Sequence, residues 1–201
     1  MNKKNSICIL SCLLAMITIF VSSCQSRYQT VIHIDYATYC ESAEELVEAV
    51  DFVYEGQVLD VSFEIWELGS GTLITEKNSK ELPQENRMLY TVYHIQVNRS
   101  YKGDVVGEVK LRIQGGIENV REEEQRKLLR ERTEKRPISI PVLATPVVCE
   151  IGGTYLFALC QDSIDAHSVL NAQQAVYSVE NPLAEDDFHV STEKILSVFD
   201  E

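Results

Sequence analysis

The chain has 201 residues, with 31 acidic and 18 basic side chains and a formal net charge of −13. This balance argues against nucleic-acid binding and against a protein that meets membranes through a polybasic surface. Without its first 23 residues the chain is 178 residues long, which suits one domain with a substantial hydrophobic core.

The first 23 residues have the pattern of an export signal. Lys3 and Lys4 precede an apolar run from Ile7 to Val21, which is a basic n-region followed by an h-region. The run is shorter than the roughly 20 apolar residues that a membrane-spanning helix needs. We therefore predict a signal peptide over residues 1–23.

The end of this signal, Val21-Ser22-Ser23-Cys24, resembles the lipobox of bacterial lipoproteins. The resemblance implies cleavage before Cys24 and transfer of a diacylglyceryl group to its thiol. Acyl chains of the palmitate type would then hold the domain at the membrane, at about 0.8 kcal/mol per buried methylene. An ordinary signal peptide, with Cys24 at this place by chance, is the alternative.

Removing residues 1–23 takes away two lysines and no acid, so the mature chain carries a formal charge of −15. Besides Cys24 it keeps Cys40, Cys149 and Cys160. An odd number of remaining thiols allows at most one disulfide, and a bridge from Cys40 to either partner stays open. No C-x-x-C or Cys/His cluster occurs, so we predict no zinc and no other cofactor, and buried thiols that act as small hydrophobic groups.

Residues 24–39 are predicted to be a tether, either a solvated linker or an edge strand. Ser42 and Glu45 then have the spacing of a capping box, which predicts a short structural helix over one end of a sheet. Residues 51–65 alternate between apolar and polar side chains, as in a long strand. Gly56 inside that strand predicts a bulge or sharp bend.

A hairpin is the centre of the predicted fold. Its first arm runs from Leu89 to Tyr101, its turn is Lys102-Gly103-Asp104, and its second arm runs from Val105 to Gln114. Both arms alternate with period two, and Gly103 suits a tight turn. A long polar loop, residues 67–88, precedes the hairpin, and long loops on a rigid scaffold often carry function or tolerate variation.

Residues 117–146 are predicted to be an insertion. Its charged run from Arg121 to Arg136 has acid-first i,i+4 pairs that support a helix, which Pro137 ends. A basic arm for an anionic polymer or lipid is one interpretation, but we favour a solvated helix or mobile insertion, because charge runs are usually exposed. An extended segment follows up to Pro146.

Three further elements complete the chain. Residues 151–160 read as a turn and a strand that is apolar on both faces and therefore central in the sheet. Residues 175–179 form a last short strand. Residues 191–200 could form a terminal helix that packs back on the barrel.

Three motifs carry a resemblance to known proteins: Val53-Tyr54-Glu55-Gly56-Gln57-Val58, Tyr101-Lys102-Gly103-Asp104, and the run from Ile151 to Leu159. Together they resemble the TIMP-like and netrin-like (NTR) group of OB-type barrels. The resemblance implies a mainly β fold, a small OB-fold-like Greek-key barrel over residues 40–201. TIMP inhibitors chelate a protease zinc through a mature Cys-x-Cys, but this chain would begin Cys24-Gln25-Ser26, so that mechanism is not carried over.

The sequence contains no nucleophile elbow, metalloprotease helix, P-loop or dinucleotide fingerprint. His94 stands on the polar face of the hairpin, where a catalytic base would sit, but one histidine without a nucleophile motif is more often a surface or packed side chain, so we predict no enzyme. The first hypothesis is a lipid-anchored binding module on the extracytoplasmic face of the cell membrane. Its contact surfaces would be residues 67–88 and 117–146, and its partner another envelope or extracellular protein rather than nucleic acid. A hydrolase with an unrecognised site and a structural envelope lipoprotein are the alternatives.

Overall fold

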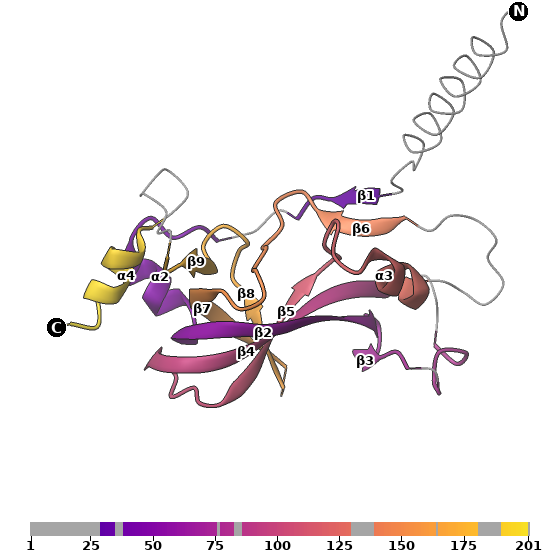
Figure 1. Ribbon diagram of the computed structural model, residues 1–201, viewed down its shortest axis with the longest axis horizontal. Coiled ribbons are helices and arrows are strands. Elements are labelled where there is room, and N and C mark those ends of the chain that lie inside the picture. The colour runs from indigo at the N-terminus through magenta and orange to yellow at the C-terminus, as the bar shows by residue number, and fades with distance from the viewer. Residues whose placement is uncertain are drawn as a thin grey trace, which may run out of the picture.

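The computed structural model describes residues 29–34, 38–75, 77–82, 86–129, 139–163, 165–180 and 190–200. Within these residues the protein is mainly β, with a seven-stranded sheet, a separate two-stranded sheet and short helices (Figure 1). None of the helices in these ranges is both long and apolar enough to cross a bilayer. The predicted signal peptide and Cys24 lie outside the described residues.

Three long antiparallel strands form the first part of the sheet: β2 (Phe52–Glu67), β4 (Arg87–Lys102) and β5 (Glu108–Gln114). The predicted hairpin is therefore confirmed. Its turn contains Gly103, whose φ is +89° and which lies so close to Asp51 and Phe52 that a Cβ would collide with them. Only glycine fits such a backbone without strain.

The sheet closes on itself. β7 (Thr154–Ser163) pairs with the first part of β2 on one side and with β8 (Ala166–Val169) on the other. β8 in turn meets β5 in parallel at the pair Leu111 and His167. The ring therefore runs β2–β4–β5–β8–β7 and back to β2, with the short strands β3 (Thr72–Leu73) and β9 (Val176–Ser178) at its margins. The central strand at 154–163 and the short strand near 177 are thus confirmed, whereas β8 was not predicted.

Gly56 marks a register shift between β2 and β4, as its place in the sequence predicted. A Cβ at this position would lie 2.6 Å from Ile95 Cγ2 and 3.0 Å from the Gln96 carbonyl oxygen. The glycine therefore allows the two strands to approach closely where the ribbon bends.

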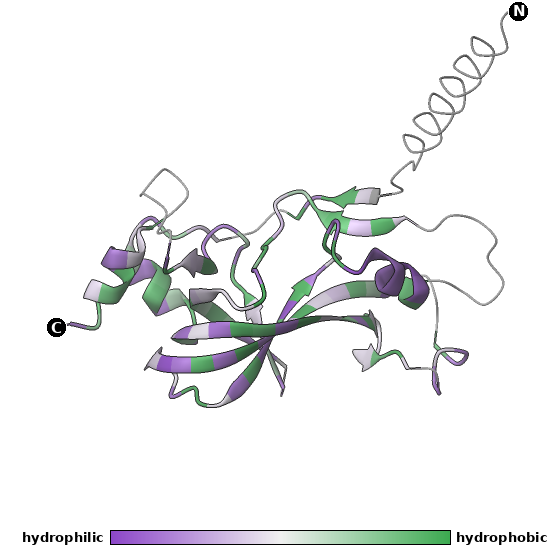
Figure 2. Ribbon diagram, in the orientation of Figure 1, coloured by the Kyte–Doolittle hydropathy of each residue, from purple (hydrophilic) through white to green (hydrophobic). Residues whose placement is uncertain are grey.

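Alternation of side chains gives β2 and β4 a buried inner face, and their ribbons change between hydrophilic and hydrophobic colours along the strands in Figure 2. β7 is buried on both faces. The core inside the ring is built from large apolar side chains that come from every long strand, among them Tyr54, Phe63, Ile65, Leu89, Tyr93, Ile95, Leu111, Phe157 and Leu159. The hydroxyl of Tyr93 donates to the Val147 carbonyl at 3.0 Å and accepts from the Cys149 amide at 3.2 Å. These bonds satisfy the one polar group that Tyr93 brings into the core.

A second apolar cluster lies outside the ring, where α2 (Ala43–Ala49) and α4 (Thr192–Ser197) cover the other face of β7. Both predicted helices are confirmed. Ser42 accepts a hydrogen bond from the Glu45 amide at 3.2 Å, as a capping box requires. Glu45 returns its bond to the Glu41 amide rather than to Ser42.

The two-stranded sheet joins segments that are distant in sequence. β1 (Gln29–Ile32) runs parallel to β6 (Ile140–Leu143), with Gln29 opposite Ile140. Ile32 and Ile34 pack against the main core. The tether was predicted to be either a solvated linker or an edge strand. Its residues Gln29–Ile32 form a strand at a sheet edge.

The part of the predicted insertion that the structure describes is docked on the barrel. α3 (Glu122–Leu129) is helical as predicted, but it is not simply a solvated helix. Arg121 donates to the Val61 carbonyl and to Asp60 on β2, both at 2.7 Å. Gln125 is fully buried and bonds to the backbone of Ile117 and Val120. Residues 130–138 lie outside the described residues.

Candidate functional site

The outer face of β2, β4 and β5 carries the polar side chains that alternate with the core. In register across the three strands, Glu64 lies opposite Tyr90, and Tyr90 lies opposite Gln114. This face also carries Ser62, Trp66, His94, Lys110 and Arg112. Sequence reasoning singled out only His94 among them.

Arg112 is the centre of this face. The residue is 5% exposed, and its guanidinium lies 4.4 Å from the centroid of the Trp66 ring. Nε donates to Glu64 at 3.1 Å, Nη1 donates to Asp162 at 2.9 Å, and Nη2 lies 3.5 Å from Asp165. Trp66 also donates from its indole nitrogen to Glu64 at 2.9 Å. The sequence signal for this cluster was the only tryptophan of the chain.

The charge of Arg112 is compensated rather than open to an anion. Burial works to lower the pKa of Arg112, but the bonds and charges of Asp162 and Glu64 outweigh it, so its pKa is raised. Because carboxylates surround the guanidinium on several sides, the arginine holds these acids in fixed positions. The cluster therefore orders the surface on which a ligand could rest.

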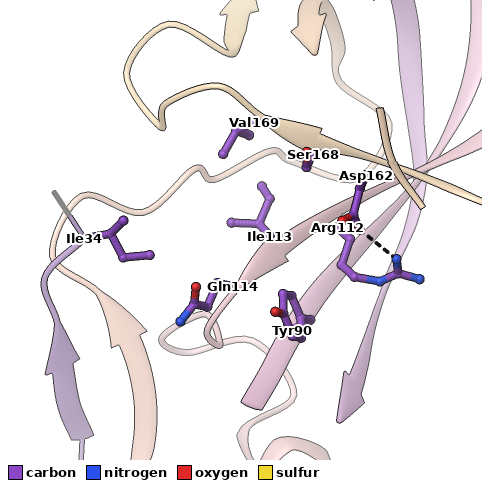
Figure 3. A pocket seen from close by; sticks show the side chains of 8 residues that line it. All are labelled: Ile34, Tyr90, Arg112, Ile113, Gln114, Asp162, Ser168 and Val169. Atoms are coloured by element: carbon purple, nitrogen blue, oxygen red, sulfur yellow. Dashed lines mark hydrogen bonds and ion pairs between the residues drawn. The ribbon is translucent and has the colours of Figure 1, made fainter. Parts of the chain in front are cut away.

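A pocket of about 180 Å³ lies beside this cluster (Figure 3). It opens where β5 and β8 diverge beyond their paired residues Leu111 and His167. Apolar side chains from three separate segments and polar groups from the strands form its walls, namely Ile34, Tyr90, Arg112, Ile113, Gln114, Asp162, Ser168 and Val169. Its walls combine apolar side chains with a few polar groups, as ligand sites do, in a volume below the roughly 300–1,000 Å³ of small-molecule pockets.

The polar groups of this pocket are mostly neutral hydrogen-bonding partners. Burial, with the nearby charge of Asp162, raises the pKa of Tyr90, so its hydroxyl remains protonated at neutral pH. Gln114 and Ser168 add an amide and a hydroxyl. Asp162 bonds to Arg112, and Glu64, Asp162 and Asp165 together outnumber the bases Arg112 and Lys110, so the pocket suits an uncharged polar or cationic group better than an anion.

A smaller pocket of about 110 Å³ lies on the other side of Ile34. Its lining includes Leu143, Ala144 and Thr145, from the last part of the segment 117–146, which was predicted to be a contact surface. None of the described residues of the predicted loop 67–88 lines either pocket. Its described part is held by Glu67, which accepts from the amides of Gly69 and Ser70 and from the Ser70 hydroxyl at 2.6–3.0 Å.

His94 lies in a chain of polar contacts across three strands. Its Nε2 is 3.0 Å from Ser62 Oγ, and its Nδ1 is 3.3 Å from Glu108 Oε1. This order of hydroxyl, imidazole and carboxylate is that of a serine-hydrolase triad. Neither pocket borders any of the three residues.

The remaining histidines in the described residues have other surroundings. His167 is 8% exposed, stacks on Phe52 at 4.1 Å, and lies 3.2 Å from the Tyr54 hydroxyl. Burial lowers the pKa of His167, so it serves as a neutral core partner. His33 lies exposed after β1.

The three cysteines of the described domain are free thiols. Cys40 and Cys149 are buried, as expected for small hydrophobic groups, and Cys160 is partly buried. Burial raises the pKa of the Cys149 thiol to about 12. Within the described ranges no three His, Cys, Asp or Glu side chains come together in a way that could hold a metal ion.

Comparison with known proteins found no match to a family model, a curated protein or a solved structure. The candidate site therefore stands on the geometry of this chain alone.

Proposed function

We propose that this chain is a lipid-anchored binding module with an OB-type barrel, on the extracytoplasmic face of the cell membrane. The pocket beside Arg112 is the observation that carries the binding part of the proposal. OB-folds are five-stranded Greek-key barrels that bind ligands on the face of their second and third strands. In the ring described above these strands are β4 and β5, which contribute Tyr90, Arg112 and Gln114 to the pocket.

The ring supports the OB-type and TIMP-like or netrin-like assignment in two further ways. It contains five strands and closes between β2 and β7. A helix, α3, lies between the third and fourth of these strands in the chain. Fold alone does not give function, so the proposal rests on the pocket.

The charged side chains around the pocket indicate which class of partner would bind there. The face around the pocket has the acids Glu64, Asp162 and Asp165 against the bases Arg112 and Lys110. A groove for nucleic acid requires an excess of positive charge. We therefore propose another envelope or extracellular protein as partner, which would insert an uncharged or cationic side chain.

The lipid anchor rests on the sequence around Cys24. A Cys24→Ser variant should leave the membrane fraction and lose the mobility shift that acylation produces. A variant that stays in membranes with unchanged mobility would remove the anchor from the proposal.

Photo-crosslinking in cells tests the binding site. p-Benzoyl-phenylalanine replaces Gln114 at the pocket or, as the matched control, Gln96 on the same strand pair. We expect one dominant protein adduct from position 114, weak or no adduct from position 96, and loss of the adduct when Ser168→Trp fills the pocket. Equal, diffuse adducts from both positions would refute this site.

The contacts of His94 favour hydrolysis as a second candidate function, with Ser62 as nucleophile and Glu108 as the orienting acid. Serine reagents of the fluorophosphonate class test it directly. Labelling of the intact protein that Ser62→Ala abolishes would support it, whereas the absence of labelling would leave the three residues as a polar ladder between strands.

A further inference from the structure

The position of β1 limits how far the domain can lie from a lipid anchor. Gln29 pairs with Ile140, and Ile32 and Ile34 pack against the barrel core. Residues 29–34 are therefore fixed to the domain. Only residues 25–28 separate Cys24 from β1.

The number of residues between Cys24 and β1 sets an upper limit on the distance between them. An extended chain covers at most about 3.6 Å per residue, so Cys24 and Gln29 are no more than about 18 Å apart. If Cys24 carries the acyl chains, as the proposed function requires, the start of β1 must lie within that distance of the lipid glycerol.

The surface at this end differs in charge from the rest of the domain. Residues 29–34 and 139–149, here called the β1–β6 end, contain no Asp or Glu, although the chain has 31 acids. Two of their valines, Val31 and Val148, are each 55% exposed, and Figure 2 shows β1 and β6 mostly in apolar colours. α3, which carries Glu122, Glu123 and Glu124, flanks this end.

The other end of the molecule is acid-rich. α2 and α4 lie there, far from β1 in Figure 1, and bring several acids to the surface, among them Glu41, Glu44, Glu45, Glu48 and Glu193. Anionic lipid headgroups repel such a surface within roughly one Debye length, about 8 Å at physiological salt. Residues 29–34 and 139–149 carry no carboxylate that such headgroups would repel, and the acids that flank them are those of α3.

We infer that the β1–β6 end faces the lipid headgroups of the leaflet that holds the Cys24 acyl chains. The inference rests on the lipid anchor of the proposed function and adds an orientation to it. Ile34 lines both pockets, so the candidate binding site lies near the bilayer surface, and a partner must approach along the membrane.

Lipid crosslinking of the full lipidated protein tests this orientation. p-Benzoyl-phenylalanine replaces Val31 or, as the matched control, Val106, which is 81% exposed in the β4–β5 turn. Val106 lies just before the start of β5 at Glu108, whereas Gly116, beyond the end of β5, meets Val142 of β6. The stretch from Glu108 to Gly116 covers about 27 Å, so the control position is that far from the β1–β6 end. In vesicles of phosphatidylethanolamine and phosphatidylglycerol we expect several-fold more lipid adduct from position 31.

A variant with a longer linker between Cys24 and β1 provides a second test of the orientation. Insertion of about 20 Gly/Ser residues before Gln29 gives the linker an r.m.s. reach of about 25 Å. We expect this variant to remain anchored but to lose most of the lipid adduct at position 31. Equal adducts at positions 31 and 106, or no effect of the longer linker, would overturn the orientation while leaving the anchor intact. Failure of Cys24→Ser to release the protein would instead overturn the anchor.

Discussion

Arg112→Met tests whether the buried arginine organises the candidate site. Methionine keeps an unbranched apolar stem against Trp66 but removes the guanidinium. The change takes away the donors to Glu64 at 3.1 Å and to Asp162 at 2.9 Å, and the cation over the Trp66 ring.

The structure sets the expected size of the loss. A hydrogen bond to a charged group contributes about 1.5–3 kcal/mol, and this range applies to Glu64, whose side chain is 18% exposed. Asp162 is 38% exposed, so water replaces much of its bond and its share falls to about 0.5 kcal/mol. The stacked cation adds about 0.5–1 kcal/mol. We expect the free energy of unfolding to fall by about 3 kcal/mol.

Urea unfolding of the exported Cys24→Ser form provides the measurement, read as a lower midpoint at an unchanged m-value. Lys110→Met is the matched control, because Lys110 pairs only with exposed Asp165 at 3.3 Å in the bonds described for it, and we expect it to cost less than about 0.5 kcal/mol. Equal, small losses in the two variants would refute the view that Arg112 is a buried structural centre.

Three further predictions concern buried polar groups. Gln125→Ala leaves the Ile117 amide and carbonyl without their partner and should lower the unfolding free energy by about 2–4 kcal/mol, with exposed Glu124→Ala nearly neutral. The lowered pKa of His167 means that the unfolded chain takes up a proton first, so stability should fall as pH drops below about 6.5; His167→Gln should remove this part of the pH dependence in urea melts. The raised pKa of Cys149 should make its thiol react with Ellman's reagent only after unfolding, and labelling of native protein at Cys149 would contradict this.

The strands that alternate clearly could be predicted from the sequence. β2, β4 and β5 carry period-two patterns, β7 is a run that is apolar on both faces, and Gly56 and Gly103 stand where a close approach and a positive φ require glycine. β8 escaped prediction because Ala166–Val169 is only four residues long and its residues are ordinary in composition. Pairing partners, and not local pattern, make it a strand.

The candidate site was less accessible to sequence reasoning. Trp66, Tyr90 and Arg112 are separated by more than 20 residues at each step, and only the strand register brings them onto one face.

The segment 117–146 was predicted to be more exposed than it is, for a related reason. A charged run predicts exposure, but Arg121 bonds with a backbone carbonyl of β2, and Gln125 is buried against the backbone of Ile117 within its own segment, which no periodicity reveals.

The strand pairs that form the closed ring differ greatly in how many residues they pair. β2 and β4 pair along nearly their whole length, whereas β5 and β8 meet at one residue pair. Local opening occurs most easily where few backbone hydrogen bonds must break. Amide hydrogens of β8 that face β5 should therefore exchange with solvent well before those of β2, whereas those that face β7 keep their partners. The pocket spans the β5–β8 pair, with Arg112 on β5 and Ser168 on β8. A ligand that contacts both strands would oppose this opening. Binding in the pocket should therefore slow hydrogen exchange at the β5–β8 pair.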